Sequence, residues 1–163
     1  MGEADWEERL ALLWTAIDDR TEADFLAAVQ ELVGELPPAD PVGLFEQASA
    51  LDSTGHSDLA ADRYRQALHG GLSGQRRRRA VIQLASSLRN MGEAQESVAL
   101  LTAELEAGSD ALDDAVRAFL ALALSGIGRE REAVSVALTA LAPHLTRYNR
   151  SVANYAEEIL RED

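Results

Sequence analysis

The chain has 163 residues, of which 47% are hydrophobic and only 5% aromatic, and its formal net charge is −13. It contains no cysteine and no lysine, since all 15 basic residues are arginine. These absences exclude a disulfide framework, a thiolate zinc site, a cysteine nucleophile, a P-loop and a Schiff-base mechanism. The abundance of alanine and leucine and the scarcity of β-branched residues favour an all-α protein.

Residues 1–36 carry two helical patterns and predict an N-terminal helical hairpin. Apolar residues recur at helical spacing from Trp6 to Ile17 and again from Phe25 to Leu36. Thr21 and Asp24 form a capping-box pattern at the start of the second helix. The acidic N-terminus and the absence of a long apolar run predict a cytoplasmic protein that does not enter a membrane.

Both tryptophans of the chain lie on the first of these helices, which leaves two interpretations open. Large aromatic side chains are usually buried, so the helix could pack against the first repeat. Interfaces are also enriched in Trp, which makes this hairpin a possible dimerisation segment. The candidate dimer contacts are Trp6, Leu10 and Trp14.

After the linker "LPPADP", similar residue types recur around three glycines, Gly55, Gly92 and Gly128, which are 37 and 36 residues apart. A small residue stands seven positions before each glycine and a leucine stands four before it. Eight positions before it the residues are Gln47, Leu84 and Leu120. Glycine can take the positive φ that ends a helix, so each unit predicts two helices joined by a tight turn. Such hairpins must stack to bury both faces.

This spacing resembles the tetratricopeptide repeat. The stretches "RRRRAVIQLASSLRNMG", "RAFLALALSGIGREREAV" and "YNRSVANYAEEIL" are also similar to a bacterial subfamily that has about three repeats after a short helical N-terminal segment. The resemblance implies an α-solenoid, a right-handed superhelix of helix hairpins, with repeats at about 41–72, 75–108 and 110–143. It also implies a protein-interaction module, a homodimer, and no chemistry of its own.

A last helix at about Tyr148 to Arg161 follows Pro143 and predicts a C-terminal capping helix, so the three repeats would occupy 41–145 and the cap 146–163. Tetratricopeptide repeats bind ligands on the concave face that the first helix of each repeat lines. Helical phase places twelve side chains on that face, and these are the predicted partner-binding residues. They are Phe45, Ser49, Arg76, Arg79, Gln83, Ser86, Arg89, Asn90, Phe119, Leu122, Arg150 and Asn154.

The remaining polar residues do not suggest catalysis. The three histidines have neither metal-ligand spacing nor an acidic partner in the sequence, and no serine lies in a nucleophile-elbow motif. Adjacent acidic pairs on a helix diverge by about 100° and cannot converge on a substrate. We therefore expect no enzyme, no metal and no cofactor.

The charge distribution bears on the run Arg76–Arg79. The first 62 residues hold 15 acidic residues and 2 arginines, so the whole net charge of −13 lies there. An acidic chain disfavours nucleic-acid binding. Positive charge at a helix N-terminus is unfavourable, which suggests an acidic counterpart, either the N-terminal segment of the same chain or of its twin, or an acidic partner. The alternative is that the run is a solvated helix start.

The sequence thus predicts a scaffold or adaptor that binds a peptide or partner protein, possibly acidic, on the concave surface. The alternative is a self-association module, in which the groove is filled by the N-terminal helices of the same chain or of its twin.

Overall fold

The computed structural model describes residues 2–161, and these form nine α-helices and two short 3-10 helices with no strand among them. The all-α fold class built from helix hairpins is therefore confirmed. The chain divides into two compact units, Met1–Ala80 and Val81–Asp163, so that the division falls inside one helix.

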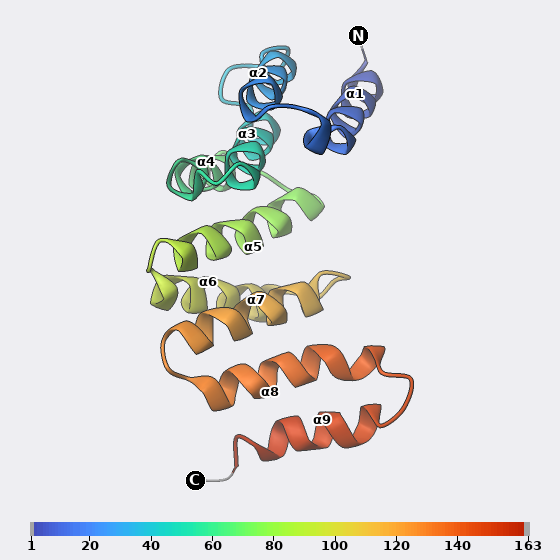
Figure 1. The fold of residues 1–163 in the computed structure, drawn as a ribbon, viewed down its shortest axis with the longest axis vertical. Helices are drawn as coiled ribbons and strands as arrows, with labels where there is room; N and C mark the ends of the chain where they lie inside the picture. The colour runs from blue at the N-terminus through green and yellow to red at the C-terminus, as the bar shows by residue number, and fades with distance from the viewer. Residues whose placement is uncertain (1, 162–163) are drawn as a thin grey trace. The chain divides into compact units, whose positions relative to one another are not determined.

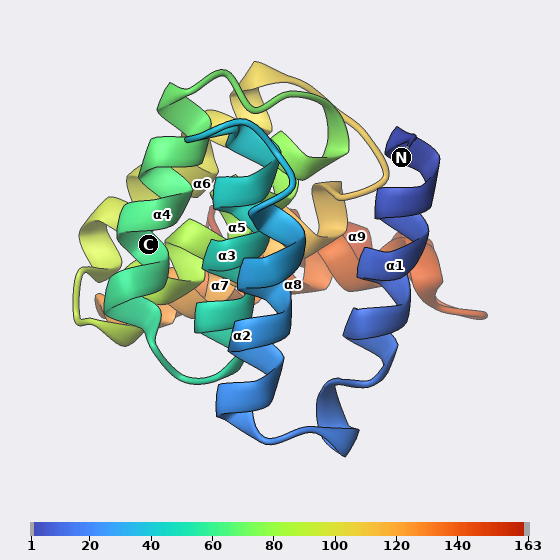
Figure 2. The ribbon, with the colours of Figure 1, turned by 90° about the horizontal axis from the view of Figure 1, so that it is seen from above.

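The first unit begins with α1 (Glu3–Thr15), a 3-10 turn η1 (Ile17–Asp19) and α2 (Glu22–Val33). The backbone N–H of Asp24 donates to Thr21 Oγ1 at 3.2 Å, which confirms the predicted cap. In Figures 1 and 2 the ribbons of α1 and α2 stand apart. Large side chains span this distance, and the rings of Trp14 and Phe25 lie 5.1 Å apart, centroid to centroid.

The first repeat of the same unit is α3 (Pro41–Ser53) and α4 (Ser57–His69), which pack side by side. Asp40 caps α3 by accepting from the backbone N–H groups of Val42 and Gly43, and Pro41 occupies the first turn. Gly43 lets α3 approach the end of α2, because a Cβ there would lie 2.9 Å from Val33 Cγ1. The start of α5 (Gly74–Asn90) completes this unit.

The second unit contains the rest of α5, then α6 (Ala94–Ala107), α7 (Asp113–Gly126), α8 (Glu130–Leu141), the turn η2 (Ala142–His144) and α9 (Asn149–Glu158). Figure 1 shows α7, α8 and α9 following one another as neighbours. Their core includes Leu101 from α6 with Leu120 and Leu124 from α7.

The glycines in the turn between the two helices of each hairpin have the conformation that the sequence predicts. The φ angles of Gly55, Gly92 and Gly128 are 89°, 88° and 77°, in the left-handed region that L side chains rarely adopt. Each glycine therefore closes one helix so that the next can return along it.

Candidate binding surfaces

Two predicted concave-face residues, Phe45 and Ser49, lie in the interior of the first unit. Their exposed fractions are 0% and 2%. Tyr64 of α4 packs against both: its ring centroid is 6.1 Å from that of Phe45, and its hydroxyl donates to Ser49 Oγ at 3.4 Å. Burial is also the main reason that the pKa of Tyr64 is raised. Phe45 and Ser49 are therefore packing residues, which corrects their assignment to a ligand-facing surface.

Arg76 is held by two carboxylates of its own unit. Its terminal nitrogens donate to Glu7 of α1 at 2.9 and 2.6 Å, and its Nε donates to Glu46 of α3 at 3.0 Å. The other oxygen of Glu46 accepts from Trp14 Nε1 at 3.1 Å. Only 4% of the Glu46 side chain is exposed, so these two donors supply the hydrogen bonds that water would otherwise make. The prediction that the arginine run pairs with the acidic N-terminal segment is confirmed for Arg76.

In this cluster, the pKa of the Arg76 guanidinium changes. Hydrogen bonding to Glu7, followed by that to Glu46, raises the pKa of the Arg76 guanidinium, although partial burial opposes the shift. Arg79, three residues later, is exposed and stacks its guanidinium over the ring of Phe45 at 5.2 Å. Of the two predicted groove arginines in this unit, Arg76 is engaged within the chain and Arg79 faces solvent.

The dimer candidates on α1 are engaged within the first unit as well. Trp6 and Leu10 are buried, and Trp6 Nε1 donates to the carbonyl oxygen of Leu32 at 2.8 Å. Arg9 donates two hydrogen bonds to Glu35, in the turn that follows α2, at 2.8 and 2.5 Å. Trp6 and Leu10 would become available to a second copy only if α1 moved away.

The predicted binding residues of the second unit are more accessible. On α5, Gln83, Ser86 and Arg89 are half-buried, and the exposed Asn90 accepts a hydrogen bond from Arg89 at 3.0 Å. On α7, Phe119 packs partly against the core, whereas Leu122 is 51% exposed.

On α9, the predicted Arg150 and Asn154 are both exposed. They stand four residues apart, so they share one side of the helix. The adjacent Tyr155 is also exposed, with an exposed fraction of 60%. Only the neighbouring Ala156 is fully buried, and its carbonyl oxygen accepts from Ser135 of α8 at 2.6 Å. The helix carries few apolar residues, so its pattern alone did not separate covered from uncovered positions.

Within residues 2–161, no group of three or more His, Asp or Glu side chains is arranged to hold a metal ion. Over the same part of the chain, no helix has both the length and the apolar character needed to cross a membrane.

Comparison with known proteins identifies the family. The model described as "Tetratrico peptide repeat" matches residues 41–159, and the chain belongs to this family. Among solved structures, the crystal structure of MamA protein superposes with a TM-score of 0.60 at 21% sequence identity, covering 83% of this chain and 71% of that one. At this identity the likeness concerns the fold. No curated protein matches the chain.

Proposed function

We propose that the protein is a non-enzymatic scaffold that binds a peptide or a partner protein through the exposed side of the first helices of its later repeats. Tetratricopeptide repeats commonly serve as protein-interaction modules, and the family assignment supports this class of function. On α7 and α9, the surface would offer apolar contact from Leu122 and Tyr155 and a carboxylate-binding guanidinium from Arg150.

The observation that carries this proposal is a contrast at one position of the repeat. Six residues before the closing glycine stand Ser49 in the first repeat and Leu122 in the third. The serine is 2% exposed and the leucine 51%. Ser86, at the same position of the second repeat, is half-buried, so exposure at this position increases along the repeats. With the exposed Tyr155 of α9, Leu122 would supply the apolar part of a contact surface.

The second candidate is self-association through α1, and the Arg76 cluster favours it. Arg76 and Glu7 are 69 residues apart in sequence, and the pair ties α1 to the start of α5. A second copy could supply the same Glu7 and Trp14 if the two chains exchanged their α1 helices, and such exchange costs little because the contacts are identical.

Photo-crosslinking tests the two candidates together. A photoreactive amino acid replaces Leu122, or replaces Val134 on α8, which is 48% exposed and serves as the matched control. The proposal predicts an adduct with a different protein at position 122 that excess unlabelled wild-type chain suppresses, and none at position 134. An adduct of twice the chain mass would favour self-association. Equal adduct patterns at both positions, or none, would contradict the proposed surface.

A further inference from the structure

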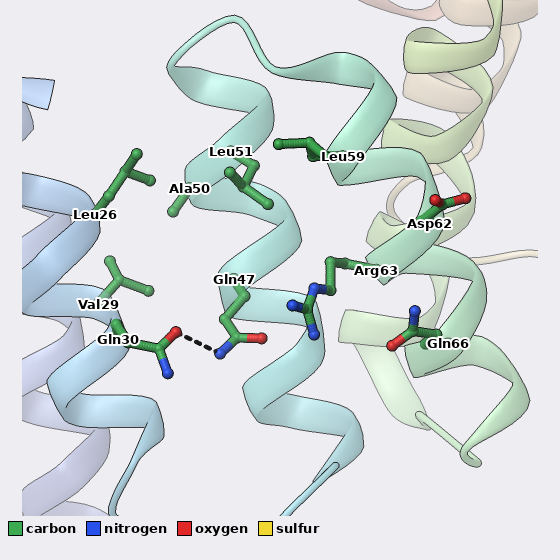
Figure 3. Close-up of a pocket in the computed structure, with 10 residues that line it drawn as sticks. All are labelled: Leu26, Val29, Gln30, Gln47, Ala50, Leu51, Leu59, Asp62, Arg63 and Gln66. Atoms are coloured by element: carbon green, nitrogen blue, oxygen red, sulfur yellow. Dashed lines mark hydrogen bonds between the residues drawn. The ribbon is translucent and has the colours of Figure 1, made fainter. Parts of the chain in front are cut away.

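A groove in the first unit lies on α2, α3 and α4, and none of the twelve predicted binding residues lines it. It encloses about 490 Å³. Figure 3 shows that Leu26, Leu51 and Leu59 gather at one end. The amides of Gln30, Gln47 and Gln66 line the other end, together with Arg63. We call this hollow the first-unit groove.

The repeat itself shows that two groove residues are unusual. Eight residues before the closing glycine, Gln47 stands where the later repeats have Leu84 and Leu120, both buried. Eight residues after it, Arg63 stands where they have Leu100 and Val136, both packed against the core of the second unit. Two positions that are apolar in both later repeats are therefore polar in the first, and they line the same hollow.

Within the described residues, Arg63 makes neither a hydrogen bond nor an ion pair. Its neighbour Asp62 also lines the hollow, but its carboxylate pairs with Arg65 at 3.7 Å. The Arg63 side chain instead extends from α4 towards Gln47 of α3. An unpaired guanidinium at the polar end of a partly apolar hollow is suited to bind a carboxylate.

The amides favour a ligand with free backbone groups. Gln47 donates to Gln30 at 2.8 Å across the base of the groove, which leaves the oxygen of Gln47 and the nitrogen of Gln30 available. Gln66 adds a further donor and acceptor. A helix satisfies its own backbone hydrogen bonds, whereas an extended segment presents N–H and C=O groups that such amides can bind.

The groove also continues beyond Arg63. A second hollow of about 350 Å³ shares Gln30, Gln47, Arg63 and Gln66 with it and runs on to the loop at Pro37 and Pro38. Space remains on both sides of Arg63. The carboxylate that it would bind is therefore more consistent with an Asp or Glu side chain inside a segment than with a C-terminal carboxylate.

From this geometry we infer that the first-unit groove binds an extended segment of a partner protein. The segment places one apolar side chain among Leu26, Leu51 and Leu59, and one Asp or Glu carboxylate on Arg63. This site is separate from the surface proposed on α7 and α9, so the two can be tested independently.

Selection from a display library of random twelve-residue peptides on the immobilised full chain provides the probe. Peptides that bind wild type share an apolar residue and an acidic residue at fixed spacing, and their affinity is then measured by fluorescence anisotropy. Arg63→Glu lowers that affinity at least about tenfold, because it replaces attraction by repulsion. Arg147→Glu, the same change at an exposed position of the second unit, leaves it within about twofold. Exchanging the acidic residue of the peptide for Lys restores binding to Arg63→Glu.

Circular dichroism of each variant checks that the helices are intact. The inference is overturned if no peptide is selected, if the selected peptides lack an acidic residue, or if Arg63→Glu binds them as well as wild type does. Loss of binding in Leu122→Glu, with none in Arg63→Glu, would also overturn it while supporting the surface on α7 and α9.

Discussion

The helix that precedes a hairpin packs differently in the two units. In the second unit, α6 covers α7, and Val98 and Leu101 join Leu120 and Leu124 in one core. In the first unit, α2 lies beside α3 in the corresponding place, but the hollow in Figure 3 remains between α2 and α4. We call the packing of α2 on the hairpin α3–α4 the open joint, and the packing of α6 on the hairpin α7–α8 the closed joint. Both hairpins turn at an equivalent glycine, Gly55 or Gly128, and the helix order is the same. The two joints differ at Gln47 and Arg63, which stand where the later repeats have apolar residues. The predictions below test whether these two side chains decide if a joint is core or surface.

The largest expected effect on stability comes from giving the closed joint the glutamine that the open joint has at the matching position. Leu120→Gln places an amide where the side chain is 6% exposed. It removes apolar packing and buries a polar group, which costs about 2–4 kcal/mol of unfolding free energy. Urea denaturation measures this loss. Leu122→Gln, on the exposed side of the same helix, should change stability by less than about 0.5 kcal/mol, and equal losses in both variants would contradict the difference in packing.

The next effect concerns how α1 is attached to the first unit. Arg76→Met removes the ionic partner of Glu46, whose side chain is only 4% exposed, and leaves that charge with Trp14 alone. A loss of about 1–3 kcal/mol follows from the poorly compensated carboxylate. Arg150→Met is the matched control, since that side chain is exposed. Stability unchanged in Arg76→Met would mean that the cluster does not hold α1.

Making the open joint resemble the closed one gives a smaller effect of opposite sign. Gln47→Leu restores the residue type of the later repeats and should raise the unfolding free energy by about 0.5–1.5 kcal/mol through better filling of the hollow. The same variant should weaken binding of the selected peptides. If the variant is stabilised and still binds the peptides at wild-type affinity, the peptides do not bind in the hollow.

The smallest effect is a pH dependence at the contact between α1 and the turn that follows α2. Hydrogen bonding from Arg9 lowers the pKa of Glu35 in the folded state. A lowered folded pKa means that the stabilisation is present above the unfolded value of about 4.3 and is lost as the pH falls through the folded pKa. Both tryptophans lie on α1, so their fluorescence should report its loosening below about pH 4. Glu35→Gln should remove this component of the transition, whereas Glu31→Gln, on the exposed side of α2, should keep it.

Sequence analysis predicted the elements that depend on local signals. The three glycines with positive φ and the Thr21 cap follow from residues close together in the chain, and so does the order of the hairpins. The burial of Phe45 could not be predicted in this way. Helical phase places it beside the core stripe of α3, and only the contact with Tyr64 decides that it is covered.

The first-unit groove was missed for a similar reason, although one signal was present. The comparison of Gln47 with Leu84 and Leu120 marks a polar residue at a core position. The sequence does not show that Gln47 lines a groove, because Arg63, which extends towards it from α4, is 16 positions away. The hollow also depends on where α2 lies.

The most direct test of the difference between the two joints is the reactivity of single cysteines in a chain that has none of its own. Leu51→Cys and Leu124→Cys place a thiol four residues before the closing glycine, in the open joint and the closed joint respectively. With methyl methanethiosulfonate under native conditions, we predict at least about tenfold faster modification at position 51 than at position 124, because Leu124 is only 3% exposed and opening of a core is rare. We also predict that a selected peptide slows modification at position 51. Equal rates at the two positions would contradict the account.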